Sequence, residues 1–287
     1  MVTIVEALNR GAEFLTKKGV PSARLQTELL LAHLLKMPRM NLYLNFAREL
    51  ASAEADALRG MIQRRGQREP LQYITGSVSF CGLELTVNSN VLIPRPETES
   101  LAEQAWKFLA SLPGDPAPRA LDLCCGSGCL AIAMAAHAAG ALITAADISG
   151  GALAVARENT ARHQLQGRLD LRQGDGFAAL DSQVKFDLIV SNPPYIPSAE
   201  IETLDPEVRD FEPRGALDGG PDGADFQRRI AREAGAFLNP NGRVMVELEE
   251  ESAENVRSIF AASAWEIERV EPDLNGQPRI LIARRPE

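Results

Sequence analysis

Cysteine and histidine are scarce in this 287-residue sequence, and neither has the spacing of a metal site. The four cysteines form no C-x-x-C pair, and the three histidines stand far apart. Structural zinc sites depend on such paired ligands, so we expect no metal. Four cysteines without a disulfide-type pattern are typical of a reducing compartment.

Long apolar segments are also missing. No run reaches the about 18 apolar residues of a membrane-spanning helix, so we expect no membrane association. The first ten residues, MVTIVEALNR, have no basic stretch leading into an apolar core, which argues against a secretory signal. Together with the cysteine pattern, this predicts a cytoplasmic protein.

The sequence has fewer basic than acidic residues. The formal net charge is −9, from 30 Lys and Arg against 39 Asp and Glu. Proteins that bind nucleic acids neutralise phosphates with clustered Lys and Arg, so we expect no direct nucleic-acid substrate. The basic run MIQRRGQREP, at residues 61–70, is a candidate contact for an acidic surface, although a solvated helix face is the simpler interpretation.

The sequence pattern divides the chain into three segments with different expected secondary structure. Residues 1–70 carry apolar positions at helical spacing, as in ARLQTELLLAHLL, and predict a small helical domain. Residues 71–93 are rich in β-branched residues, and Cys81-Gly82 is typical of a hairpin turn, so we expect a connecting β-hairpin. From residue 94 to 287, short apolar strands alternate with helical stretches. This pattern predicts an α/β domain with a mostly parallel sheet covered by helices on both faces. The candidate strands are RALDLCC, ALITAADI, LDLRQGD, FDLIVSN, GRVMVELE and RILIARR.

Ligands of such sheets bind beyond the carboxyl ends of the strands. The first strand ends in LDLCCGSG, where Gly126 and Gly128 bracket Ser127 before an apolar helix. Glycines let a ligand approach the backbone, and the helix N-terminus offers free N–H groups. Such a loop can bind either a dinucleotide or a nucleoside-type ligand. A site for a nucleoside-type ligand needs fewer glycines, but it needs carboxylates that bind the ribose hydroxyls.

Three aspartates supply these carboxylates at consecutive strand ends: Asp122, Asp147 and Asp175. Asp147 lies 19 positions beyond Gly128, a separation that suits a ribose diol. Asp175 could face an adenine amino group. Each aspartate alone could be a helix cap or a turn residue, but three in register favour a nucleoside site.

The fourth strand ends in Asn192-Pro193-Pro194-Tyr195. The asparagine carbonyl and the Pro194 carbonyl can accept both hydrogens of one –NH₂ group, and the Tyr195 ring can stack on the flat group behind it. Such a clamp stabilises positive charge growing on nitrogen and directs the lone pair of the nitrogen toward an electrophile. The pattern predicts a site for a planar amino nitrogen, either a carboxamide or an exocyclic base amine.

The sequence resembles S-adenosylmethionine-dependent methyltransferases that act on amino groups. The resemblance lies in DLCCGSG, in the second strand that ends in Asp, and in NPPY. NPPY is shared with adenine-N6 DNA methyltransferases and indicates a reaction class only. The wider chain is similar to the HemK/PrmC family, which methylates the glutamine of the Gly-Gly-Gln loop of class-I peptide chain release factors. The similarity covers nearly all of the chain and rests on TELLLAHLL, REPLQYITG, VLIPRPETE, FEPRGALDGGPDG and DLNGQPRILIARR.

The resemblance implies a Rossmann-like class I methyltransferase sheet and transfer of methyl to the glutamine N5 nitrogen. It assigns catalysis to Asn192, Pro194 and Tyr195, and substrate binding to these together with Pro193. It implies that the helical domain docks the release factor, and we expect a monomer. The expected S-adenosyl-L-methionine-binding residues are Asp122, Cys124, Cys125, Gly126, Ser127, Gly128, Asp147, Asp175, Gly176 and Asn192. The family often has an aromatic residue directly after the third-strand aspartate. Here Gly176 and then Phe177 follow, which leaves the adenine-stacking residue open.

Three other functions compete with this interpretation. Cys124 in place of the first loop glycine is similar to sister enzymes that methylate a glutamine of a large-subunit ribosomal protein. An adenine-N6 methyltransferase would use the same clamp. A non-catalytic binding module would be expected to lack Asn192 or the aspartates, which this chain retains. The helical domain and IPRPETE favour the release-factor branch.

Overall fold

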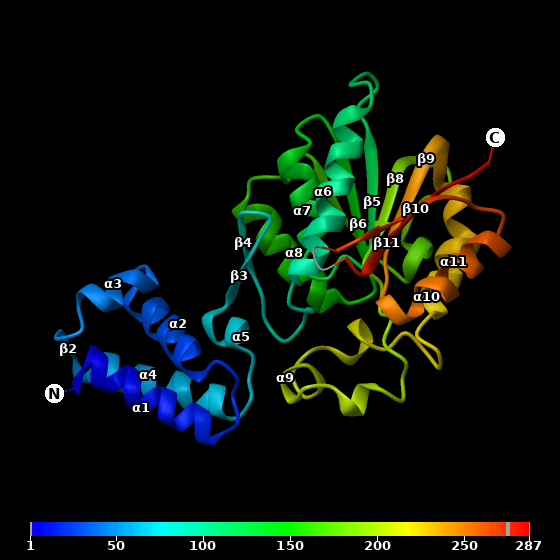
Figure 1. The fold of residues 1–287 in the computed structure, drawn as a ribbon. Coiled ribbons are helices and arrows are strands. Elements are labelled where there is room, and N and C mark those ends of the chain that lie inside the picture. Colours follow the sequence, from blue (N-terminus) through cyan, green and yellow to red (C-terminus); the bar gives the residue numbers. More distant parts are fainter. Residues whose placement is uncertain (1, 274–275, 287) are drawn as a thin grey trace. The chain divides into compact units, whose positions relative to one another are not determined.

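The computed structural model describes residues 2–273 and 276–286 of the chain. Within them, the chain forms two compact units (Figure 1). The first unit comprises Met1–Ser77 together with Asp205–Phe211, and the second comprises Val78–Leu204 and Glu212–Glu287. The chain therefore enters the first unit twice. No helix in the described residues is long and apolar enough to cross a membrane.

Helices build the first unit. Its elements are β1 (Val2–Thr3), α1 (Ile4–Lys17), α2 (Ala23–Leu35), α3 (Arg39–Leu44), β2 (Glu49–Leu50), α4 (Ser52–Gly66), α5 (Leu71–Thr75) and α9 (Pro206–Arg209). Thr3 caps α1 in a capping box with Glu6, whose carboxylate accepts from the Thr3 N–H at 3.0 Å. The apolar stripes predicted from the sequence, including Leu8 and Leu30, are buried in one core. β1 and β2 form a short antiparallel pair that the sequence pattern did not indicate.

The predicted hairpin is present as β3 (Ser77–Phe80) and β4 (Leu83–Thr86). Cys81 and Gly82 both have positive φ, 49° and 76°, as a two-residue turn of the primed type requires. The hairpin occupies less of the chain than residues 71–93. Residues 71–75 form α5 instead and belong to the first unit, whose boundary falls at Ser77 rather than at residue 70.

A seven-stranded sheet organises the second unit, in the order β10-β11-β9-β8-β5-β6-β7. Four neighbouring pairs are parallel, and β11 runs antiparallel to both β9 and β10. The strands are β5 (Arg119–Leu123), β6 (Leu142–Asp147), β7 (Leu169–Gln173), β8 (Phe186–Ser191), β9 (Leu238–Glu247), β10 (Glu266–Pro272) and β11 (Pro278–Arg284). The helices are α6 (Pro96–Ser111), α7 (Cys129–His137), α8 (Gly150–Arg162), α10 (Asp225–Glu233) and α11 (Ala253–Ala262).

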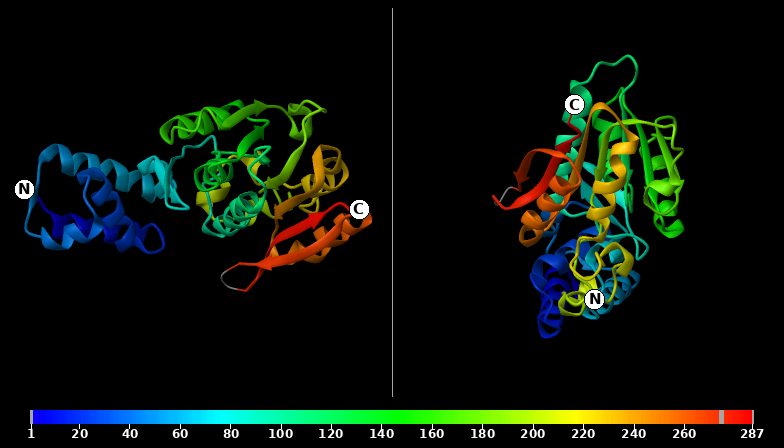
Figure 2. Two further views of the ribbon diagram at one scale, coloured as in Figure 1. Left: turned by 90° about the horizontal axis from the view of Figure 1, so that it is seen from above. Right: turned by 90° about the vertical axis from the view of Figure 1, so that its right-hand side faces the viewer.

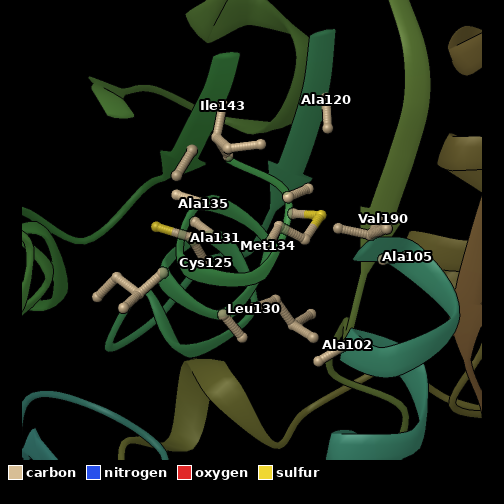
Figure 3. Close-up of a cluster of buried hydrophobic side chains, with 14 of the residues drawn as sticks. Ala102, Ala105, Ala120, Cys125, Leu130, Ala131, Met134, Ala135, Ile143 and Val190 are labelled. Atoms are coloured by element: carbon tan, nitrogen blue, oxygen red, sulfur yellow. The ribbon is translucent and has the colours of Figure 1, made fainter. Parts of the chain in front are cut away.

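Alternate strand residues face two separate cores. In β5, Ala120 packs with α6, α7 and α8 on one face, whereas Leu121 and Leu123 pack with α10 and α11 on the other. Figure 2 shows helices on both sides of the sheet, and Figure 3 shows side chains of α6 and α7 gathered in the first core. This is the predicted Rossmann-like α/β sheet. It brings the carboxyl ends of β5, β6 and β8 to one edge, because these strands run parallel.

Candidate active site

A pocket of about 440 Å³ lies at this edge of the sheet, within the second unit. Loops after β5, β6, β7 and β8 all contribute to it, as the topology of a parallel sheet requires. It is lined by Asn90, Val91, Leu92, Cys124, Gly126, Ala146, Asp147, Ile148, Ser149, Ala152, Asp175, Gly176, Asn192, Pro194, Pro213, Gly215, Ala216 and Phe226. Of the site residues predicted from the sequence, the pocket gathers Cys124, Gly126, Asp147, Asp175, Gly176, Asn192 and Pro194.

The loop after β5 is tightly wound. Cys124, Gly126 and Gly128 all have positive φ, at 61°, 53° and 79°. A side chain at Gly126 would meet no atom within 4 Å, whereas one at Gly128 would lie 3.2 Å from the Cβ of Ala156. Gly126 therefore leaves room for a ligand, and Gly128 allows the loop to pack closely against α8. Cys124 holds a conformation that favours glycine, and burial raises the pKa of its thiol.

Asp147 joins the two loops at the pocket. One carboxylate oxygen accepts a hydrogen bond from the Gly126 N–H at 2.9 Å, and the other accepts from the Ser149 N–H at 2.9 Å. A carboxylate has about four acceptor positions, so capacity remains for ligand hydroxyls. Asp147 also lines the pocket directly.

Asp122 occupies a different position from the other aspartates. Its side chain is fully buried and accepts from the Ala131 N–H in the first turn of α7 at 3.1 Å. The pKa of Asp122 is raised to about 8, mainly by burial and to a smaller extent by the nearby Asp147, against the opposing effect of the Ala131 hydrogen bond. Asp122 does not line the pocket, and the same holds for the predicted cofactor residues Cys125, Ser127 and Gly128 and for the predicted substrate residue Pro193. Cys125 and Ser127 belong to the glycine loop itself, and both are buried, at 4% and 2% exposed.

The loop after β7 places Asp175 at the pocket, where the Arg229 guanidinium donates to its carboxylate and, at 2.7 Å, to its backbone carbonyl. Gly176 has a φ of +56°, a conformation that favours glycine, and a side chain there would also lie 2.9 Å from Cζ of Arg229. Phe177 is buried and stacks on Phe237 at 5.0 Å between ring centroids. Phe177 is therefore a core residue and does not line the pocket.

Apolar surface for a flat ring comes from residues that the sequence patterns did not single out. Ile148, directly after Asp147, is 67% exposed and lines the pocket, and Phe226 of α10 lines it from another side. Ile148 therefore offers the pocket an apolar side chain that is open to solvent. The only sequence signal for it is its place one residue after the second-strand aspartate.

The clamp residues at the end of β8 have distinct surroundings. Asn192 and Pro194 line the pocket, and the Asn192 Nδ2 donates to the Thr98 Oγ1 at 3.1 Å. Tyr195 does not line this pocket. Burial raises the pKa of its hydroxyl, with the charge of Glu247 adding to the effect.

The segment FEPRGALDGGPDG supports the clamp loop from outside. Ile196 donates to the Leu217 carbonyl at 3.0 Å, and its own carbonyl accepts from the Gly219 N–H at 2.9 Å. A side chain at Gly223, where φ is +75°, would lie 2.2 Å from the Tyr195 carbonyl oxygen. The glycines of this motif therefore let two loops run backbone against backbone. No group of three metal-type side chains stands together in the described ranges.

The fold and the pocket together define a methyltransferase of the Rossmann-like class. Comparisons with known proteins agree: residues 6–76 match the PrmC N-terminal domain, and residues 103–204 match the methyltransferase small domain. A methyltransferase structure from Pyrococcus furiosus shares the fold at a TM-score of 0.53 and 20% identity, over 70% of this chain and 88% of that one.

Curated relatives give the particular family. A release factor glutamine methyltransferase of Geobacter sulfurreducens is 45% identical over 282 residues, which cover 98% of this chain and 96% of the relative. One of Chlorobaculum tepidum is 41% identical over 271 residues, which cover 93% and 92%. The chain belongs to the release factor glutamine methyltransferase family. The family resemblance read from the motifs is thereby confirmed.

Proposed function

We propose that this protein transfers a methyl group from S-adenosyl-L-methionine to the N5 nitrogen of the glutamine in the Gly-Gly-Gln motif of class-I peptide chain release factors. One observation carries the proposal. Asn192 and Pro194 share a single pocket with Asp147 and the glycine loop. The relatives named as release factor glutamine methyltransferases, which span nearly the whole chain, support the choice of substrate.

The pocket residues fit the proposed cofactor. The open space over Gly126 admits a ligand close to the backbone, and the Asp147 carboxylate has free acceptor positions for a ribose diol. Ile148 and Phe226 offer apolar surface for the adenine ring. Asp175, held by Arg229, can accept from an exocyclic amine through its remaining lone pairs. When bound, the cofactor supplies an electrophilic methyl group on a sulfonium sulfur.

The clamp acts on the attacking nitrogen. A carboxamide nitrogen is a poor nucleophile because its lone pair is delocalised. Asn192 Oδ1 and the Pro194 carbonyl accept its two hydrogens, hold the lone pair in line with the methyl group, and stabilise the positive charge that develops. These acceptors contribute mainly in the transition state, where the N–H groups become more acidic.

The reaction balances without a strong base. With the methyl donor bound, a nitrogen–carbon bond would form as the carbon–sulfur bond of the donor breaks, which would leave a neutral thioether. The nitrogen then carries one proton too many, which makes it strongly acidic, and that proton passes along the acceptors to water. Asn192 and Pro194 therefore act by positioning and charge stabilisation.

We further propose that the first unit docks the release factor, because a glutamine clamp alone contacts too little surface to select one protein. One chain supplies the glycine loop, Asp147 and the clamp, which supports a monomer as the active form. Release factors act in translation, which supports a cytoplasmic location for the proposed reaction.

The test uses labelled methyl donor with intact enzyme and three candidate substrates: a class-I release factor, large-subunit ribosomal proteins and duplex DNA. Label on the Gly-Gly-Gln glutamine, located by peptide mapping, supports the proposal. A release factor with that glutamine changed to asparagine is the matched control and stays unlabelled. Label on the ribosomal protein alone, or on adenine, contradicts the proposal and assigns the enzyme to a sister reaction.

A further inference from the structure

A buried asparagine of α8 holds the last residue of the hairpin strand β4, which lies beside that helix (Figure 1). Asn159 is 0% exposed. Its Oδ1 accepts a hydrogen bond from the Thr86 N–H at 2.7 Å, and its Nδ2 donates to the Thr86 carbonyl at 3.0 Å. The carboxamide therefore bonds both backbone groups of Thr86, as a neighbouring strand would.

The same side chain also holds the glycine loop after β5. The Asn159 Nδ2 donates a second hydrogen bond, at 3.1 Å, to the carbonyl of Ser127. Backbone N–H groups only donate and carbonyls only accept, so a single orientation of the Asn159 amide satisfies all three backbone groups. Asn159 thus joins the end of β4 to the glycine loop between Gly126 and Gly128.

Both segments that Asn159 joins continue into walls of the pocket. Beyond Thr86 the chain lines the pocket with residues 90–92, and the glycine loop lines it with Cys124 and Gly126. Asn159 itself does not line the pocket and lies behind these walls. The spacing of two pocket walls therefore depends on hydrogen bonds made by one buried amide.

Other contacts between α8 and the hairpin segment are weaker or lie at the surface. Arg162 donates to the Glu84 carboxylate at 2.7 Å, but both side chains are exposed, and such pairs contribute little. Near the start of α8, a side chain at Gly151 would lie 2.9 Å from the Asn90 Oδ1, so Asn90 packs closely on the helix. The Asn159 amide is thus the buried polar contact that fixes this segment against α8.

We propose that Asn159 is a positioning residue that orders the S-adenosyl-L-methionine pocket before the methyl donor binds. The inference rests on the proposed function for the use of this pocket by the methyl donor, and it requires no contact between Asn159 and the donor. A pocket whose walls are already fixed needs little ordering when its ligand binds. Without the Asn159 hydrogen bonds, ordering of the two walls becomes part of the cost of binding.

The experiment uses two substitutions in the full chain. In Asn159→Asp the carboxylate can still accept from the Thr86 N–H, but it has no hydrogens for the carbonyls of Thr86 and Ser127 and repels them. Asn159→Ala removes all three hydrogen bonds. We expect each variant to bind S-adenosyl-L-methionine about tenfold or more weakly, as measured by isothermal titration calorimetry. The KM for the methyl donor should rise in parallel. The kcat with a release factor should stay within about threefold of wild type, because neither substitution touches the clamp after β8.

Two control variants separate this role from general stability. Thr160 follows Asn159 in α8 and is also buried, and its hydroxyl donates to the Ala156 carbonyl at 2.7 Å. Val256 of α11 is 0% exposed and belongs to the core on the other face of the sheet, so its truncation destabilises the domain without touching the pocket. Thr160→Val and Val256→Ala should keep the affinity and the KM for the methyl donor within about threefold of wild type.

Hydrogen exchange of the ligand-free protein tests the ordering directly. The Gly128 N–H donates to the Cys125 carbonyl at 2.7 Å within the glycine loop. It should exchange faster in Asn159→Asp than in Val256→Ala, because only the first variant loosens the loop locally.

Three results would overturn the proposal. They are an affinity within about twofold of wild type in both Asn159 variants, an equal loss of affinity in Val256→Ala, and failure of both Asn159 variants to fold, which would assign Asn159 to general stability. If wild type binds the methyl donor but labels no release factor, the proposed function fails, and calorimetry of the same variants still decides the role of Asn159.

Discussion

The Asp147 Oδ2 accepts a hydrogen bond from the Gly126 N–H at 2.9 Å, which joins the end of β6 to the glycine loop after β5. The same carboxylate accepts from Ser149 N–H at the start of α8. Asp147 therefore organises two loops of the pocket before any ligand binds. A ligand hydroxyl would meet a carboxylate that is already fixed in place, so little ordering is required on binding.

Asp147→Ala should weaken S-adenosyl-L-methionine binding by at least about tenfold, because charge-assisted hydrogen bonds contribute roughly 1.5–3 kcal/mol. Isothermal titration calorimetry measures the affinity. Asp170→Ala is the control, since Asp170 is an exposed carboxylate paired with Arg172 outside the pocket. Unchanged affinity in a folded Asp147→Ala protein would remove this residue from the binding site.

Asn192→Ala should reduce the single-turnover rate by about 10²–10³, far more than it weakens cofactor binding. The reason is that an acceptor for the developing positive charge is lost. Asn239→Ala is the matched control, because Asn239 also donates a side-chain hydrogen bond, to Asp187 at 2.8 Å, but does not line the pocket. A rate within a few-fold of wild type for Asn192→Ala would show that the clamp does not contribute as proposed.

Local sequence signals were sufficient for most of the fold. The alternation of apolar strands and helices reveals the parallel sheet, and the two positive φ values at Cys81-Gly82 agree with the hairpin turn. The sequence pattern did not predict the edge strand β10, because its sequence, EIERVEP, carries three glutamates and an arginine. Edge strands often carry charges, which weakens the alternation. Residues 205–211 were assigned to the methyltransferase domain, but they pack in the first unit, a long-range contact that leaves no local pattern.

The candidate site likewise contains residues that local sequence patterns predict and residues that they do not. Residues with a backbone or motif signature, such as Gly126, Asp147 and Asn192, come together in the pocket. Phe226 lines the pocket, and Arg229 holds the pocket residue Asp175, only through tertiary packing, and neither carries such a signature. Leu274 and Asn275 of the DLNGQPRILIARR motif lie outside the described residues, and its remaining residues include β11.

Gly223→Ala should impair methyl transfer by about tenfold or more without touching the pocket. The added Cβ would lie 2.2 Å from the Tyr195 carbonyl oxygen, and φ is +75°, so the clamp loop must shift. Gly114→Ala is the control, because a side chain there meets no atom within 4 Å. The measurement is the single-turnover rate of methyl transfer by each of the two variants. Equal rates would mean that the loop tolerates the shift.

Glu247→Gln should stabilise the protein increasingly as pH rises from about 4.5 to about 7. Burial raises the folded-state pKa of Glu247 from 4.5 to about 7, so the folded state binds the proton more tightly than the unfolded state. Below pH 4.5 both states are protonated and this difference is absent. Above pH 7 the folded state bears the full cost of a buried charge. Urea unfolding at several pH values measures the effect. Glu254→Gln, at a side chain 88% exposed, should show no such trend.

The last prediction concerns Glu207, which contacts two arginines inside the first unit. Arg65 donates to the Glu207 Oε1, and Arg68 Nε donates to the same oxygen at 2.7 Å. The Arg65 side chain is only 3% exposed. Glu207→Gln would leave a buried guanidinium without its anionic partner, so we expect unfolding of the first unit to become easier by about 1–3 kcal/mol.

The pH dependence has the opposite sign to that of Glu247. Burial alone would raise the Glu207 pKa, but hydrogen bonds from Arg68 and Arg65 outweigh it and lower the pKa below 4.5. The stabilisation is therefore present above pH 4.5 and lost as pH falls through the folded-state value. The difference between wild type and Glu207→Gln should shrink in acid. Glu13→Gln, which breaks an exposed pair with Lys17 in the same unit, should leave stability nearly unchanged, because solvent screens that pair. Equal effects of the two substitutions in denaturant titrations would show that the buried contact adds nothing to the stability of this unit.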